Sequence, residues 1–219
     1  MGCFWEPAES LLKEQGVLAT TVGYTGAPPN KQAPTYDSVC FGRDWVEAVR
    51  VAYDDEVVSY EQLLDYFFQY QKPKPGYRQY DSIIFANDTN EEKAASQWKS
   101  ISASTKQKRD DNLPYEIVEI EPASKFYKAE EYHQRYWEKQ RLRFLIGFLL
   151  IAGESGAYNN LFDGALGQLE FNGLSFEGVC GGVFLLGAVW TVAERLVTNG
   201  MVQELNEGDF IAMAQLEKD

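Results

Sequence analysis

The chain has 219 residues, of which 45% are hydrophobic and 14% aromatic, enough for one good-sized domain with or without an appendage and too apolar for global disorder. The formal net charge of −13, without any basic stripe, excludes a nucleic-acid backbone as partner. Three cysteines without CxxC spacing and a single histidine, His133, fit neither a disulfide framework nor a zinc site, so no metal is expected.

The chain opens on Gly2-Cys3-Phe4-Trp5, directly before a helical pattern over residues 6–15. The first N–H groups of a helix have no internal partner and carry partial positive charge, which lowers the pKa of a nearby thiol and favours the nucleophilic thiolate. The alternative is structural, because free cysteines and aromatic side chains are most often buried in cores. Spacing alone leaves both interpretations open.

No secretory signal or transit peptide is visible, because Cys3 stands only two residues after Met1. Such an abrupt start leads us to expect that sequence before Met1 is missing or was removed.

Strands and helices are expected to alternate from residue 17 to about residue 140. In chain order they are a strand over 17–24, a Gly/Pro/Asn loop over 23–34, a strand over 45–53, a helix over 60–70 capped by Ser59, a strand over 80–85, a helix over 91–108 and a strand over 115–120. An aromatic-rich segment over 126–137 could wrap this domain. The pattern predicts a mixed α/β or α+β domain over residues 1–140.

The composition changes in residues 141–219, which form a hydrophobic helical tail. Residues 144–153 and 178–193 are runs of ten and sixteen residues without charge. Because a membrane helix needs about 20 mainly apolar residues, we expect one spanning helix over 176–195, and an interfacial or re-entrant position for the shorter run. The alternative for both runs is a helix buried against the domain or against a partner.

An ordered set of landmarks in the first two-thirds of the chain resembles the peptide-methionine (S)-S-oxide reductases, the A-type methionine sulfoxide reductases. The landmarks are Gly2-Cys3-Phe4-Trp5, Val22-Gly23-Tyr24-Thr25-Gly26, Pro34-Thr35-Tyr36, Val39-Cys40, Glu47-Ala48-Val49, Ser59-Tyr60-Glu61-Gln62-Leu63-Leu64, Gln79-Tyr80, Ser82-Ile83-Ile84 and Ala129-Glu130-Glu131-Tyr132-His133-Gln134. The resemblance implies a ferredoxin-like two-layer α/β sandwich and thiol-dependent reduction of methionine-S-sulfoxide.

The resemblance also assigns a role to individual residues. Cys3 matches the catalytic cysteine, whose thiolate attacks the sulfoxide sulfur and becomes a sulfenic acid. Glu47 matches the carboxylic acid that protonates the sulfoxide oxygen, a role that requires a raised pKa. Tyr36 and Tyr80 match the two catalytic hydroxyls that orient this oxygen. Phe4 and Trp5 match the aromatic walls that bind the substrate methyl group.

Several stretches depart from the family pattern. Trp45-Val46 stands where the family has a histidine-alanine pair, and Gln71-Lys72-Pro73 where it has His-Asp-Pro. The segment 73–77 replaces one whose aspartate holds the substrate backbone, so no residue inherits that role. The family's central first strand is absent from the chain as given, which predicts an unpaired sheet edge or a substitute.

The resemblance implies no bound cofactor, but it does imply an external thiol reductant: thioredoxin, glutaredoxin or glutathione. Cys40 is a possible resolving thiol through a Cys3–Cys40 disulfide, whereas Cys180 lies inside the candidate membrane helix. A one-cysteine cycle resolved by glutathione or glutaredoxin is the other route.

Two functions from different classes remain open. One is an active reductase tethered to a membrane or membrane complex through residues 144–195. The other is a non-catalytic, reductase-like structural subunit of such a complex, for which the lost aspartate and the unusual tail argue. The stretches 43–45 and 72–76 are similar to divergent family members from photosynthetic algae, which makes an intracellular membrane, the plastid thylakoid, the expected location.

Overall fold

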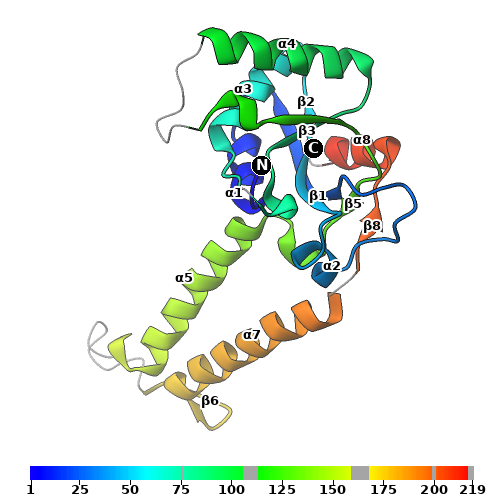
Figure 1. Cartoon of the computed structure of the whole chain (residues 1–219). Coiled ribbons are helices and arrows are strands. Elements are labelled where there is room, and N and C mark those ends of the chain that lie inside the picture. Colours follow the sequence, from blue (N-terminus) through cyan, green and yellow to red (C-terminus); the bar gives the residue numbers. More distant parts are fainter. Residues whose placement is uncertain (75, 106–112, 159–167, 199–200, 217–219) are drawn as a thin grey trace. The chain divides into compact units, whose positions relative to one another are not determined.

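The computed structural model describes residues 1–219 except 75, 106–112, 159–167, 199–200 and 217–219 (Figure 1). The chain divides into two compact units. Unit 1 contains Met1–Arg135 together with Gly200–Asp219, and unit 2 contains Tyr136–Asn199. The predicted boundary at residue 140 lies close to the start of unit 2. The last residues of the chain, however, were predicted to belong to the tail and are grouped with unit 1.

Unit 1 contains a four-stranded sheet in the order β2-β1-β5-β8. Strands β1 (Val17–Thr25) and β2 (Val46–Tyr53) pair antiparallel from Val17↔Tyr53 to Thr25↔Val46, with one irregularity after Val17. The short strands β5 (Tyr127–Lys128) and β8 (Gln203–Glu204) continue the sheet beyond β1. The β-branched residues of β1 and β2 favour this extended, half-buried backbone.

A separate parallel pair is formed by β3 (Ile83–Ala86) and β4 (Glu119–Pro122). The predicted strands over 80–85 and 115–120 therefore begin later than expected. Their first residues belong to the 3-10 turns η1 (Arg78–Tyr80) and η2 (Tyr115–Ile117). In η2, the Tyr115 side chain is buried and stacks on Phe68, with 3.8 Å between the ring centroids. Burial of this aromatic pair outweighs the local preference for an extended backbone.

Helices complete unit 1. They are α1 (Trp5–Leu12), the short α2 (Tyr36–Cys40), α3 (Tyr60–Tyr70), α4 (Thr89–Thr105) and α8 (Glu207–Leu216), with a further turn η3 (Glu131–His133). Helix α3 starts where the sequence predicts, because Ser59 and Gln62 form a reciprocal capping box. Leu64, Phe67 and Phe68 on its inner face pack with Trp98 of α4 in one hydrophobic cluster.

Strands β2 and β3 each have one edge without a strand partner among the described residues. Met1, Val49, Val51, Ile83 and Ile84 line a cavity of about 870 Å³ that touches both strands. The resemblance predicted an unpaired edge for this domain. The mixed α/β architecture is confirmed, with its strands divided between separate sheets.

The C-terminal segment packs on unit 1 through β8 and α8. Leu205 and Phe210 are buried with Phe126, and the Arg50 guanidinium lies 4.9 Å from the Phe210 ring centroid and 5.8 Å from that of Phe126. Arg50 also donates a hydrogen bond of 2.9 Å to the Leu205 carbonyl. These apolar and cation–π contacts explain why the last residues join unit 1 instead of the tail.

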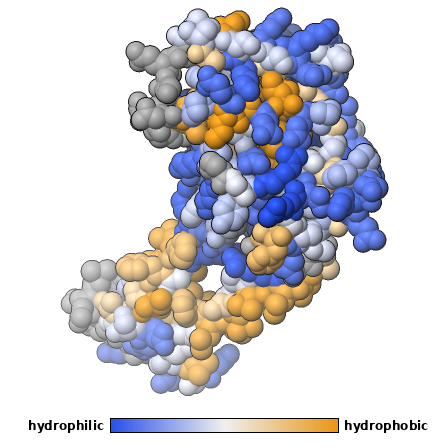
Figure 2. All heavy atoms as spheres, viewed as in Figure 1, coloured by the Kyte–Doolittle hydropathy of each residue, from blue (hydrophilic) through white to orange (hydrophobic). Residues whose placement is uncertain are grey.

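The described part of unit 2 contains two helices, α5 (Tyr136–Glu154) and α7 (Phe176–Thr198), with a small hairpin of β6 (Glu170–Phe171) and β7 (Leu174–Ser175) before α7. The uncharged run 144–153 forms most of one continuous helix, and the predicted 176–195 lies within α7. Figure 2 shows apolar surface over both helices, in addition to an apolar patch on unit 1. Among the described residues, α7 is the one helix long and apolar enough to cross a membrane.

The packing of α8 yields a stability prediction. Phe210→Ala removes a side chain that is 5% exposed, and the unfolding free energy of the protein is expected to fall by about 3–5 kcal/mol, as for other core Phe→Ala changes. The neighbouring Ile211→Ala, at 48% exposure, is the matched control and should cost less than about 1 kcal/mol. Urea unfolding measures both. Equal losses would show that α8 does not fold onto unit 1.

Candidate active site

The backbone of Lys72 holds the first residues of the chain in place. The Lys72 N–H donates to the Met1 carbonyl at 2.9 Å, and Gly2 forms a parallel bridge with Lys72. A Cβ atom on Gly2 would stand 2.0 Å from the Lys72 carbonyl oxygen, and Gly2 has a φ of +76°. Only glycine fits this close approach and this left-handed backbone, which together fix where Cys3 lies.

Cys3 precedes α1, and the Trp5 N–H at the start of that helix lowers the pKa of the thiol, as the sequence predicts. The net prediction of a lowered pKa is nevertheless wrong. Although the residue is exposed as a whole, loss of hydration around the sulfur raises the pKa of Cys3 to about 11, and the Glu47 carboxylate adds to the rise. The resting thiol is therefore protonated near neutral pH.

Glu47 is buried at the start of β2 and is held by two hydrogen bonds. The Phe4 N–H donates to Oε2 at 3.1 Å, and the Gln79 side-chain amide donates to Oε1 at 2.6 Å. Burial raises the pKa of Glu47, and these two donors offset part of the rise. The direction matches the sequence expectation and favours a carboxyl group that can hold a proton beside Cys3.

Two aromatic residues after Cys3 have different surroundings. Phe4 is only 2% exposed and packs against Tyr24 and His133 at 5.8 and 5.4 Å between ring centroids, so it supports the site from within the core. Trp5 is half-buried, and its indole N–H donates to His133 Nδ1 at 3.0 Å. Of the two predicted substrate-contacting walls, Trp5 is the one with exposed surface.

A buried polar network behind these aromatics was not assigned a role by sequence reasoning. His133 accepts from Trp5 through Nδ1, and its Nε2 lies 3.8 Å from the carboxylate of Glu130. The Tyr24 hydroxyl donates to the same Glu130 oxygen at 3.0 Å. Tyr24, Glu130 and His133 all belong to the sequence landmarks of the family. Only the fold shows that this network contacts Trp5 and Phe4 on their buried side and orients them.

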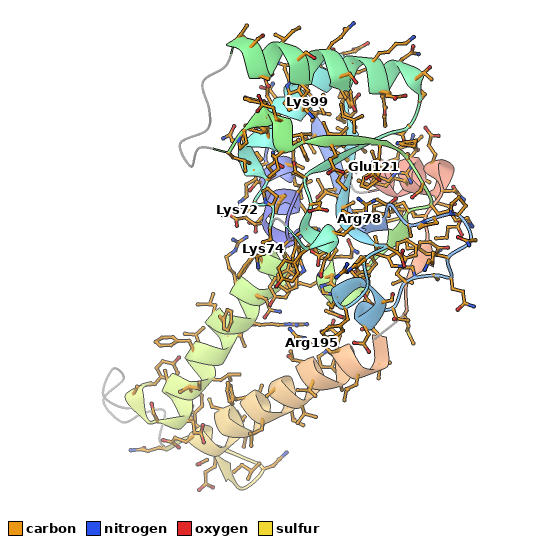
Figure 3. The ribbon with its side chains drawn as sticks, viewed as in Figure 1. Lys72, Lys74, Arg78, Lys99, Glu121 and Arg195 are labelled. Atoms are coloured by element: carbon orange, nitrogen blue, oxygen red, sulfur yellow. The ribbon has the colours of Figure 1, made fainter. Side chains whose placement is uncertain are left out.

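The turn η1 carries Gln79 and Tyr80 and is anchored by Arg78, which is labelled in Figure 3. Both terminal guanidinium nitrogens of Arg78, Nη1 and Nη2, donate to the Glu121 carboxylate at 2.9 Å, and this pairing raises the pKa of Arg78. Tyr80 is half-buried, with the Lys74 ammonium 5.1 Å from its ring centroid. The same Lys74 charge lowers the pKa of Cys3, although less strongly than burial raises it.

The remaining predicted residues lie on α2. Tyr36 begins this helix, after the Thr35–Ser38 capping box, but its side chain lies outside the described ones. Cys40 is half-buried at the end of α2, and the Gln79 amide lies 3.9 Å from its sulfur. Gln79 therefore contacts both Glu47 and Cys40.

Chemically, this arrangement combines an accessible thiol, a buried carboxyl group with a raised pKa and a partly exposed aromatic surface. Among the described residues, no group of three or more His, Cys, Asp or Glu side chains could hold a metal ion. Such a site can transfer a proton to a small polar atom while the sulfur attacks a neighbouring electrophilic centre.

The close approach at Gly2 can be tested by substitution. Gly2→Ala combines a clash with the Lys72 carbonyl and a left-handed backbone, so the unfolding free energy should fall by about 1–3 kcal/mol beyond the roughly 1 kcal/mol of backbone strain. Gly76→Ala is the matched control, because Gly76 also has a positive φ but no atom within 4 Å of the added Cβ. If chemical denaturation gives both variants the same loss, Lys72 does not constrain Gly2.

The coupling between Glu47 and Cys3 predicts a pKa change. Glu47→Gln removes a negative charge beside the sulfur, so the pKa of Cys3 should fall below about 11 while staying above that of an ordinary thiol, because burial remains. The pH dependence of alkylation at the Cys3-containing peptide, followed by mass spectrometry, measures this shift. Glu6→Gln, an exposed carboxylate paired with Lys72, is the control and should leave it unchanged. An unaltered profile in Glu47→Gln would show that the two groups are not coupled.

Comparison with known proteins identifies relatives of this chain. The chain is 39% identical to the peptide methionine sulfoxide reductase MsrA of Methanosarcina mazei over 150 residues, covering 64% of this chain and 67% of that protein. For the MsrA of Methanosarcina acetivorans the identity is 42% over 150 residues, covering 64% and 75%.

Among solved structures, the chain resembles Mxr1 from Saccharomyces cerevisiae in an unusual oxidized form, with 29% identity, a TM-score of 0.46 and coverage of 63% of this chain and 76% of that one. The family model described as peptide methionine sulfoxide reductase matches residues 1–146. The chain therefore belongs to the peptide methionine sulfoxide reductase family.

Proposed function

We propose that the chain reduces methionine-S-sulfoxide, with Cys3 as the nucleophile and Glu47 as the acid. Family membership supports reduction of methionine sulfoxide in general. The observation that carries the finer assignment is the hydrogen bond from the Phe4 N–H to Glu47, which ties the buried carboxyl group to the residue next to the thiol. The raised pKa of Glu47 supports its role as a proton donor.

The chemistry balances in three steps. The Cys3 thiol gives up its proton as its sulfur attacks the sulfoxide sulfur, while Glu47 protonates the sulfoxide oxygen. That oxygen ends on the Cys3 sulfur as a sulfenic acid, and the proton released by the thiol restores the Glu47 carboxyl group. The methionine sulfur gains two electrons, and the cysteine sulfur loses two. A second thiol then displaces water from the sulfenic acid to form a disulfide, and a third thiol reduces that disulfide.

The remaining site residues hold the substrate. Trp5 provides the apolar surface for the methyl group, and Phe4 supports it from the core. The hydroxyls of Tyr80 and Tyr36 are proposed to hydrogen-bond the sulfoxide oxygen, which develops negative charge during attack.

Recycling is proposed to use either Cys40 or an external thiol from thioredoxin, glutaredoxin or glutathione. Cys40 is half-buried and shares the Gln79 amide with the Glu47 site. Cys180 is buried in unit 2 against Gly153, which argues against a role in thiol exchange.

The tail is proposed to attach the enzyme to a membrane through residues 144–195. Support comes from α7, of which only 11% of the most apolar stretch is buried in the structure. A plastid thylakoid is the proposed membrane, from the altered stretches 43–45 and 72–76 alone. Carbonate extraction of full-length protein tests attachment, and release into the soluble fraction would contradict it.

An activity assay tests the proposed reaction. Full-length protein with dithiothreitol should reduce a peptide containing methionine-S-sulfoxide and leave the R diastereomer unchanged. Cys3→Ser should lose activity on the order of a thousandfold or more, because the covalent nucleophile is gone. Cys40→Ser is the control, since dithiothreitol can replace a resolving thiol. Absence of turnover in the wild-type chain would favour the structural-subunit alternative.

A further inference from the structure

The two helices of unit 2 run antiparallel and touch along their length. Arg143 of α5 forms an ion pair with Glu194 of α7 at 2.5 Å. At the other end, a Cβ on Gly153 would stand only 2.6 Å from the Cys180 sulfur, so this glycine permits close helix contact. The helices therefore form a hairpin whose Arg143–Glu194 end is its open end.

At the open end of this hairpin, both helices are connected through the chain to unit 1. Helix α5 begins at Tyr136, directly after Arg135. After α7, the chain pairs in the unit 1 sheet from Gln203 onward, where Lys128↔Gln203 and Tyr127↔Glu204 are partners. The Leu205 N–H also donates to the Phe126 carbonyl at 2.9 Å. A single membrane crossing by α7 would place these two attachment points on opposite sides of a bilayer and would separate β8 from β5.

In total length, both helices match the thickness of a bilayer, although by itself only α7 among the described helices is also apolar enough to cross one. At 1.5 Å per residue, the 19 residues of α5 and the 23 of α7 extend about 28 and 34 Å, compared with about 30 Å for the hydrocarbon core. The uncharged run 144–153 is shorter than the core, and four charged residues precede it in α5. Arg143 is paired with Glu194 between the helices. Charges within membrane-spanning segments are commonly paired in this way, facing a neighbouring helix. Glu138, Lys139 and Arg141 lie at the open end, where long basic side chains can reach the membrane surface.

Apolar side chains are exposed around both helices and not along one stripe. Those at least 47% exposed are Leu142, Phe144, Leu145, Ile146, Phe148, Leu149, Ile151, Val183, Leu185, Leu186, Val189, Trp190, Val192, Leu196 and Val197. On α5, the consecutive residues Phe144, Leu145 and Ile146 point in three directions 100° apart. A second copy of the chain would cover one side of such a hairpin, whereas lipid covers all sides.

The charges at the two ends of the hairpin differ in sign. Lys139, Arg141, Arg143 and Arg195 lie at or near the open end, and no Lys or Arg occurs from residue 144 to 194. The acidic residues Glu154, Glu170 and Glu177 lie at the connecting end. This is the charge distribution of a hairpin whose basic end stays on the side of synthesis while its connection crosses.

We propose that α5 and α7 cross a lipid bilayer together as a two-helix hairpin, with both ends and unit 1 on one side and the acidic connection on the other. This proposal rests on the proposed membrane attachment and replaces the single span over 176–195. The reductase site and the C-terminal segment then share one compartment, as the β5–β8 pairing requires.

Labelling of single cysteines in sealed membranes tests this topology. In full-length protein with Cys3, Cys40 and Cys180 replaced by serine, a cysteine is introduced at Glu138, Glu170 or Gln215, all of which are exposed. A membrane-impermeant PEG-maleimide is added before or after detergent, and the gel shift is scored. Thermal unfolding of each variant, compared with the wild-type chain, verifies that the replacements leave the fold intact.

The expected result is that Glu138→Cys and Gln215→Cys behave alike and Glu170→Cys behaves oppositely, whichever way the vesicles face. Glu138→Cys and Gln215→Cys on opposite sides would overturn the hairpin in favour of a single span. Labelling of all three variants in intact, carbonate-resistant membranes would overturn the crossing and indicate a hairpin lying on the surface. Release by carbonate would instead contradict membrane attachment itself. The proposed reaction is tested separately, because a sulfoxide reduction assay on the unsubstituted chain does not depend on the membrane topology.

Discussion

The hydrogen bond between the Phe4 N–H and the Glu47 carboxylate is the contact on which the site depends. It joins the start of α1 to the start of β2, two elements that are far apart in the sequence. Because Glu47 is buried, an unpaired carboxylate there would be costly, and the Phe4 and Gln79 donors make its position tolerable. The same burial raises the pKa of both Glu47 and Cys3, so one environment adjusts the carboxyl group and the thiol.

The stretches in which this chain departs from its family still support the site. Lys72 belongs to one of them, yet its backbone is what holds Met1 and requires glycine at position 2. Lys74 belongs to another, and its ammonium lies over the Tyr80 ring and favours the Cys3 thiolate. Arg78 fixes the following turn through Glu121. The altered residues thus retain a framework for the thiol, which supports the catalytic proposal over a purely structural one.

The C-terminal segment links the two units in a way that restricts any membrane arrangement. Arg50 on β2 is enclosed by Phe126 and Phe210, and Leu205 completes this cluster. Since β8 is part of the unit 1 sheet, unit 2 is an insertion between two segments of one folded unit. An inserted helical hairpin returns to its starting side, whereas a terminal tail is free to end on either side.

Features that depend on local chemistry are predictable from the residues alone: the cysteine before a helix, the Ser59 cap of α3, the position of Glu47 on a strand and the apolar runs of the tail. Caps and periodicity act over a few residues, so they can be read directly. The raised pKa of Cys3, the contact of Trp5 with His133 and the pairing of β5 with β8 emerge only from the folded chain. Each depends on residues distant in the chain, because desolvation and strand pairing are set by what folding brings together.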